Sequence, residues 1–138
     1  MTLFMFTLLK YLWALPTTSL GLMLVLPTYL TGGRGQWVEG VFELHGGMIG
    51  WMLTRLVPLP GGASAMTLGH VVIGRNLDCL DRTRSHERVH VRQVERWGPF
   101  FLPAYFGYSA WLMLCRRDAY RENPFEIEAF ALEDSTQC

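Results

Sequence analysis

The chain has 138 residues, which is enough for one compact domain. Its formal net charge is zero and only 17% of its residues are charged, which argues against nucleic acid as a partner. Hydrophobic residues make up 50% of the chain, so a core can form and wholesale disorder is excluded. Only five charged residues lie in residues 1–74, so this half has the composition of membrane or core segments.

The three cysteines, Cys79, Cys115 and Cys138, form neither a CxxC pair nor an even set. This spacing excludes a disulfide framework and a cysteine-based zinc ribbon. We expect Cys79 and Cys115 to be buried as small apolar side chains, and Cys138 to lie in a frayed terminus.

Residues 11–33 contain no charged side chain, and about 20 apolar residues suffice for a helix to cross a bilayer. Trp13 and Tyr29 lie near the two ends, where interfacial aromatic residues concentrate. Pro16 and Pro27 each remove a backbone donor and can divide the run. We expect a single membrane helix over residues 11–31, with a buried apolar helix or a cleaved signal peptide as alternatives.

The strand signals lie in residues 36–75. Partial alternation predicts a strand over residues 38–44, followed by a turn at Gly46 and Gly47. Residues 48–57 fit either a second strand or a short helix. Residues 65–73 are rich in β-branched side chains and predict a further strand.

Helical patterns dominate from residue 81 onward. A helix over residues 81–97 is predicted, with Asp81 as its N-cap and Gly98 and Pro99 at its end. Residues 97–115 form a second uncharged run. Asn123 and Pro124 are residue types preferred at helix starts, so the last helix is expected to begin there.

The main chemical signal is the HExxH sequence formed by residues 86–90. His86 and His90 are four residues apart and share a helix face, so both imidazoles can bind one metal ion. Glu87 can hold the water that completes the coordination and accept its proton. The alternative is an amphipathic helix that carries two surface histidines.

Two imidazoles and a water leave zinc one protein ligand short. Glu126 falls in an inward-facing apolar sector of the last helix, and Glu128 lies at the edge of that sector. Glu126 is therefore the favoured third ligand, although Asn123 and Glu126 also fit a capping box. Glu128, His45 and His70 are the alternative ligands.

Residues 65–131 resemble the small HExxH zinc metallopeptidases of the gluzincin type. In those enzymes a T-x-G strand precedes the metal helix, this helix reads H-E-x-x-H-x-x-Q, and a later E-x-x-A helix supplies the third ligand. The corresponding segments here are Thr67–Gly69, His86–Gln93 and Glu126–Ala129. The last element is also similar to that of the membrane-bound CAAX-processing zinc peptidases.

The resemblance implies an α+β fold with a minimal zincin-like domain over residues 35–138. It does not extend to residues 1–34, which the uncharged run predicts to be a hydrophobic membrane segment. This domain would contain a small β-sheet, the HExxH helix and a C-terminal ligand helix, with residues 65–73 lining the cleft. Zinc would be bound by His86, His90 and Glu126, and Glu87 would be the catalytic base.

The expected function is hydrolysis of a peptide or protein substrate by a membrane-anchored enzyme, whose metal domain lies on an aqueous face. Two other hypotheses remain open. One is a non-catalytic metal-binding or partner-binding protein associated with the membrane, and the other is a small membrane protein with an accidental HExxH.

The chain departs from these families at two positions. Arg88 stands where active HExxH peptidases usually have an uncharged residue, and Phe130 replaces the Asp that follows E-x-x-A in CAAX-type enzymes. Arg84, Arg88 and Arg92 form a stripe opposite the histidines. We expect this stripe to be exposed to solvent, with an acidic neighbour or lipid head groups as the alternatives.

The proposed ligands also constrain the uncharged run 97–115, which as a helix would be about 28 Å long and able to cross a membrane once. One crossing would separate Glu126 from the histidines. The run is therefore expected to be a core helix, an in-plane segment or a re-entrant hairpin.

Tyr120 and His70 are candidate donors to an oxyanion, and Gln93 is a candidate hydrogen-bond partner of the ligands.

Overall fold

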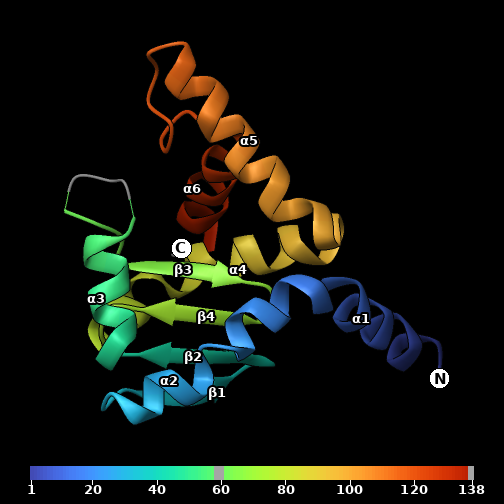
Figure 1. The fold of residues 1–138 in the computed structure, drawn as a ribbon. Coiled ribbons are helices and arrows are strands. Elements are labelled where there is room, and N and C mark those ends of the chain that lie inside the picture. The colour runs from blue at the N-terminus through green and yellow to red at the C-terminus, as the bar shows by residue number, and fades with distance from the viewer. Residues whose placement is uncertain (58–60, 137–138) are drawn as a thin grey trace.

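The structure is a computed structural model that describes residues 1–57 and 61–136, the last three by their backbone alone. It is an α+β fold with a mixed four-stranded sheet and an apolar N-terminal helix (Figure 1). The strands are β1 (Arg34–Val38), β2 (Val41–His45), β3 (Ala65–Leu68) and β4 (Val71–Gly74). The helices are α1 (Thr2–Leu22), α2 (Val25–Leu30), α3 (Gly47–Arg55), α4 (Leu77–Trp97), the 3₁₀ turn η1 (Gly98–Phe100), α5 (Phe101–Leu114) and α6 (Pro124–Thr136).

The sheet has the strand order β1-β2-β4-β3. Strands β2 and β4 are parallel, and the two outer pairs are antiparallel. Side chains alternate between the faces of a strand, so Val71 and Ile73 of β4 pack with α3, whereas Val72 packs with Leu80 and Val91 of α4. Helices α3 and α4 therefore cover opposite faces of the sheet (Figure 1).

Both predicted strands contain a turn: residues 41–44 are a strand as predicted but follow a hairpin turn, and residues 65–73 form a complete hairpin. The segment 38–44 is interrupted at Glu39 and Gly40, whose φ angles of 51° and 81° match a tight hairpin turn. The segment 65–73 turns at Gly69, whose φ is 68°. Residues 48–57, for which both strand and helix were open, belong largely to α3, and this helix rather than a turn follows Gly46.

Helix α4 begins four residues before the predicted start. Asn76 is its N-cap and accepts a hydrogen bond from the backbone N–H of Cys79 at 2.8 Å, so the prediction of Asp81 as cap is wrong. The predicted end is confirmed, since Gly98 follows the last helical residue with a φ of 59°.

The prediction that the arginine stripe of α4 faces solvent is wrong for two of its three members. Glu43 of β2 is 1% exposed and points at α4. It accepts hydrogen bonds from Arg84 at 2.8 and 3.0 Å, and from Arg88 at 3.3 Å. A buried carboxylate needs such partners, so the stripe joins α4 to the sheet, and only Arg92 is exposed.

Three residues of helix α1 are buried: Ala14, Thr17 and Gly21. Tyr11 and Trp13 add hydrogen bonds to the backbone of Gly40 and Arg96. Gly21 lies so close to Val71 that a side chain there would clash. Pro16 does not end the helix, and the interruption falls instead between α1 and α2. The stretch Thr2–Leu30 is long and apolar enough to cross a membrane, a property shared by signal sequences and buried helices.

Helix α5 extends away from the sheet, and the chain then returns through α6 to α4 (Figure 1). Only Phe101 and Leu112 of α5 are buried, so the run 97–115 is not a core helix. Cys115, directly after α5, is exposed, contrary to expectation, whereas Cys79 is buried as predicted. Cys138 lies outside the described residues.

Candidate metal centre

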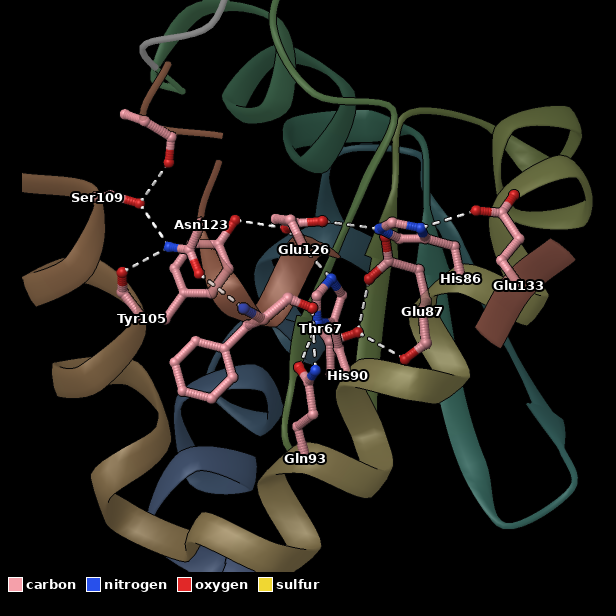
Figure 2. A network of polar contacts seen from close by, with 12 residues as sticks. Thr67, His86, Glu87, His90, Gln93, Tyr105, Ser109, Asn123, Glu126 and Glu133 are labelled. Carbon is pink, nitrogen blue, oxygen red and sulfur yellow. Dashed lines mark hydrogen bonds and ion pairs between the residues drawn. The ribbon is translucent and has the colours of Figure 1, made fainter. Parts of the chain in front are cut away.

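Helices α4 and α6 bring three side chains together between them (Figure 2). His86 and His90 lie one turn apart on α4, and Glu126 lies in the first turn of α6. Glu126 Oε2 is 2.9 Å from His86 Nε2, and Glu126 Oε1 is 3.2 Å from His90 Nε2. All three residues are buried, and their possible ligand atoms lie within 4.8 Å of one another, so the group can hold a metal ion.

The position of Glu126 is fixed by the buried Asn123 just before α6. The Asn123 side chain accepts a hydrogen bond from the N–H of Phe125 at 3.0 Å and donates to Tyr105 O and Ser109 Oγ of α5 at 3.0 and 2.9 Å. The carboxylate of Glu126 is directed at the histidines, so it does not complete a capping box.

The alternative ligands do not reach the group. Glu128 is partly exposed and lies 3.7 Å from Arg96. His70 pairs with Glu95 at 2.9 Å in the β3–β4 turn region, and His45 ends β2. The structure thus places Glu126, and none of these three, beside the two histidines.

The Nδ1 atoms of both imidazoles, which lie away from Glu126, also have hydrogen-bond partners. Nδ1 of His86 lies 2.9 Å from Oε2 of Glu133, and Nδ1 of His90 lies 2.8 Å from Oε1 of Gln93. The Gln93 amide donates to Phe125 O at 3.0 Å, so its oxygen must face His90 and accept. Because both partners are acceptors, Nδ1 donates in each ring, and Nε2 is the nitrogen that would bind a metal ion in place of its contact with Glu126.

The three side chains form a strongly coupled charge cluster. Burial alone would raise the pKa of Glu126, but hydrogen bonds from the two histidines outweigh it and lower this pKa to about 2. Burial alone would lower the pKa of His90, but Glu126 and Glu87 outweigh it and raise this pKa to about 9. A divalent cation at this position would displace the hydrogens that Nε2 of the two histidines share with Glu126.

Glu87 lies beside the cluster on α4 and is buried. The Thr67 hydroxyl of β3 donates a hydrogen bond to its Oε2 at 2.6 Å (Figure 2). Burial raises the pKa of Glu87, although the charge of His90 and the Thr67 hydrogen bond act in the opposite direction. A carboxyl group with a raised pKa next to a metal site has the properties of a general base.

Two residues at the site were not predicted from the sequence. The Tyr105 hydroxyl donates to Oε1 of Glu126 at 2.5 Å, and burial raises the pKa of this hydroxyl, which keeps its proton at neutral pH. Tyr105 lies in the apolar run 97–115, and no sequence pattern there indicated a functional residue. Glu133 lies seven residues after Glu126 on the same helix face, so its spacing was a usable signal.

Of the two predicted oxyanion donors, Tyr120 lies near the metal-ligand group and His70 does not. Tyr120 packs against Phe130, whose ring centroid is 4.6 Å from that of His86. His70 instead stacks on Tyr11 of α1.

No family model, curated protein or solved structure matches this chain. Within residues 1–57 and 61–133, His86, His90 and Glu126 are the single group of three His, Cys, Asp or Glu that meets the distance requirement for a shared ion.

Proposed function

We propose that this protein is a zinc-dependent peptidase of the HExxH type, with a minimal zincin-like domain over residues 35–138. The observation that carries the proposal is the convergence of two Nε2 atoms and one carboxylate, beside a buried glutamate on the same helix. Two histidines and a glutamate leave one coordination position open, which is typical of catalytic rather than structural zinc.

Zinc bound by these three residues would lower the pKa of water and polarise a peptide carbonyl. Glu87 accepts the proton from the attacking water and later donates it to the leaving amine. Thr67 holds one carboxylate oxygen of Glu87, which leaves the other to carry this proton. The raised pKa of Glu87 brings its protonation closer to neutral pH, as a residue in both roles requires.

Tyr105 takes the place of His70 among the candidate donors to the substrate oxyanion, and its hydroxyl would turn from Glu126 to this oxygen. Its hydroxyl is 2.5 Å from Glu126 and keeps its proton at neutral pH. Tyr120 remains a second donor, since its ring packs on Phe130 next to His86.

The substrate is a peptide or protein that meets the enzyme at a membrane surface. Residues 11–31 anchor the chain, and the metal domain lies on an aqueous face. Two features support this arrangement: most of α1 is exposed although its side chains are apolar, and α5, which carries Tyr105, exposes Phe106, Trp111 and Leu114.

A non-catalytic metal-binding protein is the second candidate, because the same ligands would serve a structural ion. Glu87 argues against it, since a structural site gains nothing from a buried carboxylate that must be stabilised by Thr67.

The test is to measure zinc content and peptide hydrolysis side by side on the full chain in neutral detergent. We expect about one zinc per chain and hydrolysis in the unmodified protein. Glu87→Gln should keep zinc and lose hydrolysis, Glu126→Ala should lose both, and the control Glu128→Ala should lose neither. Zinc without hydrolysis would support the structural alternative, and zinc-independent hydrolysis would contradict the proposal.

A further inference from the structure

Helix α5 has an apolar surface on the side that faces away from the rest of the protein. Its buried residues are Phe101 and Leu112. Phe106, Ala110 and Leu114 recur at four-residue spacing on a different face, and all three are exposed. The exposed face of a helix in a soluble protein usually carries polar residues, but α5 has no charged residue on any face. This face therefore needs an explanation other than contact with water.

The exposed side chains of α5 are large, and their surface continues onto α1. Phe106, Trp111 and Leu114 are 53%, 63% and 80% exposed. Beside Phe106 lies an open groove of about 440 Å³ between the two helices, lined on the α1 side by Pro16 and Leu20. An apolar surface that extends over two helices is typical of a site that contacts a partner or a membrane.

Unpaired positive charge follows this surface in residues 115–123, which the chain reaches at the far end of α5 (Figure 1). Arg117 pairs with Glu122 at 2.7 Å. Asp118 accepts hydrogen bonds from two backbone N–H groups of the same loop. The side chains of Arg116 and Arg121 are exposed and form no ion pair within the described part of the chain. Both carboxylates of the loop are thus in use, and two guanidinium groups are left over.

An apolar helix that ends in unpaired arginines has the chemistry of an anionic membrane surface. Acyl chains accept the apolar side chains, and headgroup phosphates accept the guanidinium donors. Trp111 lies between the apolar face and the arginines, where interfacial aromatic residues concentrate. A symmetric dimer through α5 is less suitable, because the partner's α5 has no acidic residue to pair with these arginines.

The length of α5 fixes how it meets the bilayer. Its 14 residues extend over about 21 Å, which is shorter than the hydrocarbon core of about 30 Å. Insertion by its C-terminal end would also bury the arginines among acyl chains, which is costly. The helix therefore has to lie along the surface, with its arginines at the level of the headgroups.

We propose that α5 lies along the surface of an anionic lipid membrane, as a membrane contact additional to residues 11–31. Phe106, Trp111 and Leu114 pack among the acyl chains, and Arg116 and Arg121 bind headgroup phosphates. This contact requires neither zinc nor peptide hydrolysis.

Cys115 provides the position for a reporter, because it is exposed directly after α5. A fluorophore is attached to it in the full chain carrying Cys138→Ser, in which the remaining Cys79 is buried. The labelled chain is reconstituted into vesicles that contain a nitroxide-labelled lipid as quencher. The vesicles consist of phosphatidylcholine alone or mixed with phosphatidylglycerol. We expect stronger quenching in the mixed vesicles, because the arginines bind the anionic headgroups.

The arginines are tested one at a time. Arg116→Gln and Arg121→Gln should each lower the equilibrium constant for docking on the mixed vesicles, obtained from the quenching, by about fivefold. Arg82→Gln is the matched control, since Arg82 is an exposed residue of α4 that pairs with Asp78. It should leave the quenching unchanged.

The apolar face is tested separately. Trp111→Ser should lower the quenching in both kinds of vesicle, because it removes a large side chain from the acyl region. Trp51→Ser is its control, since Trp51 lies on α3 and is 58% exposed, similar to Trp111. It should have no effect.

Equal quenching in the two kinds of vesicle, or variants that behave like their controls in either pair, would overturn the proposal. So would an unquenched reporter in a chain that forms a dimer dissociated by Trp111→Ser, because a second copy would then cover α5. Zinc content and hydrolysis are not readouts, so failure here is distinguishable from failure of the proposed peptidase activity.

Discussion

The carboxylate of Glu133 lies 2.9 Å from Nδ1 of His86. Helix α6 therefore supplies both a candidate metal ligand, Glu126, and a residue that orients a second ligand from behind. Phe130 occupies the position where CAAX-type peptidases carry a supporting Asp. In this chain Glu133, one helical turn further along α6, lies at hydrogen-bond distance from His86.

We predict that Glu133→Ala weakens zinc binding by about 10- to 100-fold, because His86 loses the acceptor that fixes its tautomer and ring orientation. The affinity is measured by competition with a chelator of known zinc affinity. Glu128→Ala is the control, since Glu128 lies on the same helix near Arg96. Equal zinc affinities in the two variants would show that Glu133 does not support the site.

Thr67→Val should keep the zinc and lower kcat, because Val has the shape of Thr but cannot donate to Glu87. The Thr67 hydrogen bond lowers the pKa of Glu87, so its loss should raise that pKa and move the acidic limb of the kcat/KM profile to higher pH. Thr83→Val is the control, since the Thr83 hydroxyl donates to the backbone carbonyl of Cys79 within α4. An unshifted profile would argue against Glu87 as the base.

The metal-free protein should be most stable in mildly acidic solution. The pKa of His90 is raised from 6.5 to about 9, so its contribution to stability is complete below pH 6.5 and is lost as the pH rises through 9. The pKa of Glu126 is lowered from 4.5 to about 2, so its contribution is complete above pH 4.5 and is lost as the pH falls through 2.

Melting temperatures measured from pH 3 to 10 with chelator and with zinc check this expectation. Above pH 6.5 the chelated protein should lose stability while the zinc-loaded protein does not, since the ion replaces the titrating protons. Parallel curves for the two forms would mean that zinc does not occupy this cluster.

Local sequence patterns were sufficient for the elements that carry the candidate ligands. The i, i+4 spacing of His86 and His90 and the Asn-Pro start of α6 each depend on residues close in the chain. The wheel position of Glu126 selected the carboxylate that lies beside the histidines, because α6 buries its first turn against α4.

The parts that the sequence did not predict depend on contacts between distant segments. The turn at Gly69 interrupts a run whose apolar pattern continues unchanged on both sides. Glu43 is charged, so the sequence suggested an exposed residue, and only the packing of β2 on α4 explains its burial between Arg84 and Arg88. Tyr105 reaches the site because the chain turns back after α5 and brings Asn123 and Glu126 within hydrogen-bond distance of it, which no local pattern specifies.

The central claim is that His86, His90 and Glu126 bind one zinc ion. Zinc X-ray absorption on the purified full chain tests this claim most directly. We predict two imidazole nitrogens at about 2.0–2.1 Å together with oxygen ligands, and the loss of this spectrum in Glu126→Ala. Sulfur scattering from the cysteines, or an unchanged spectrum in Glu126→Ala, would contradict the account.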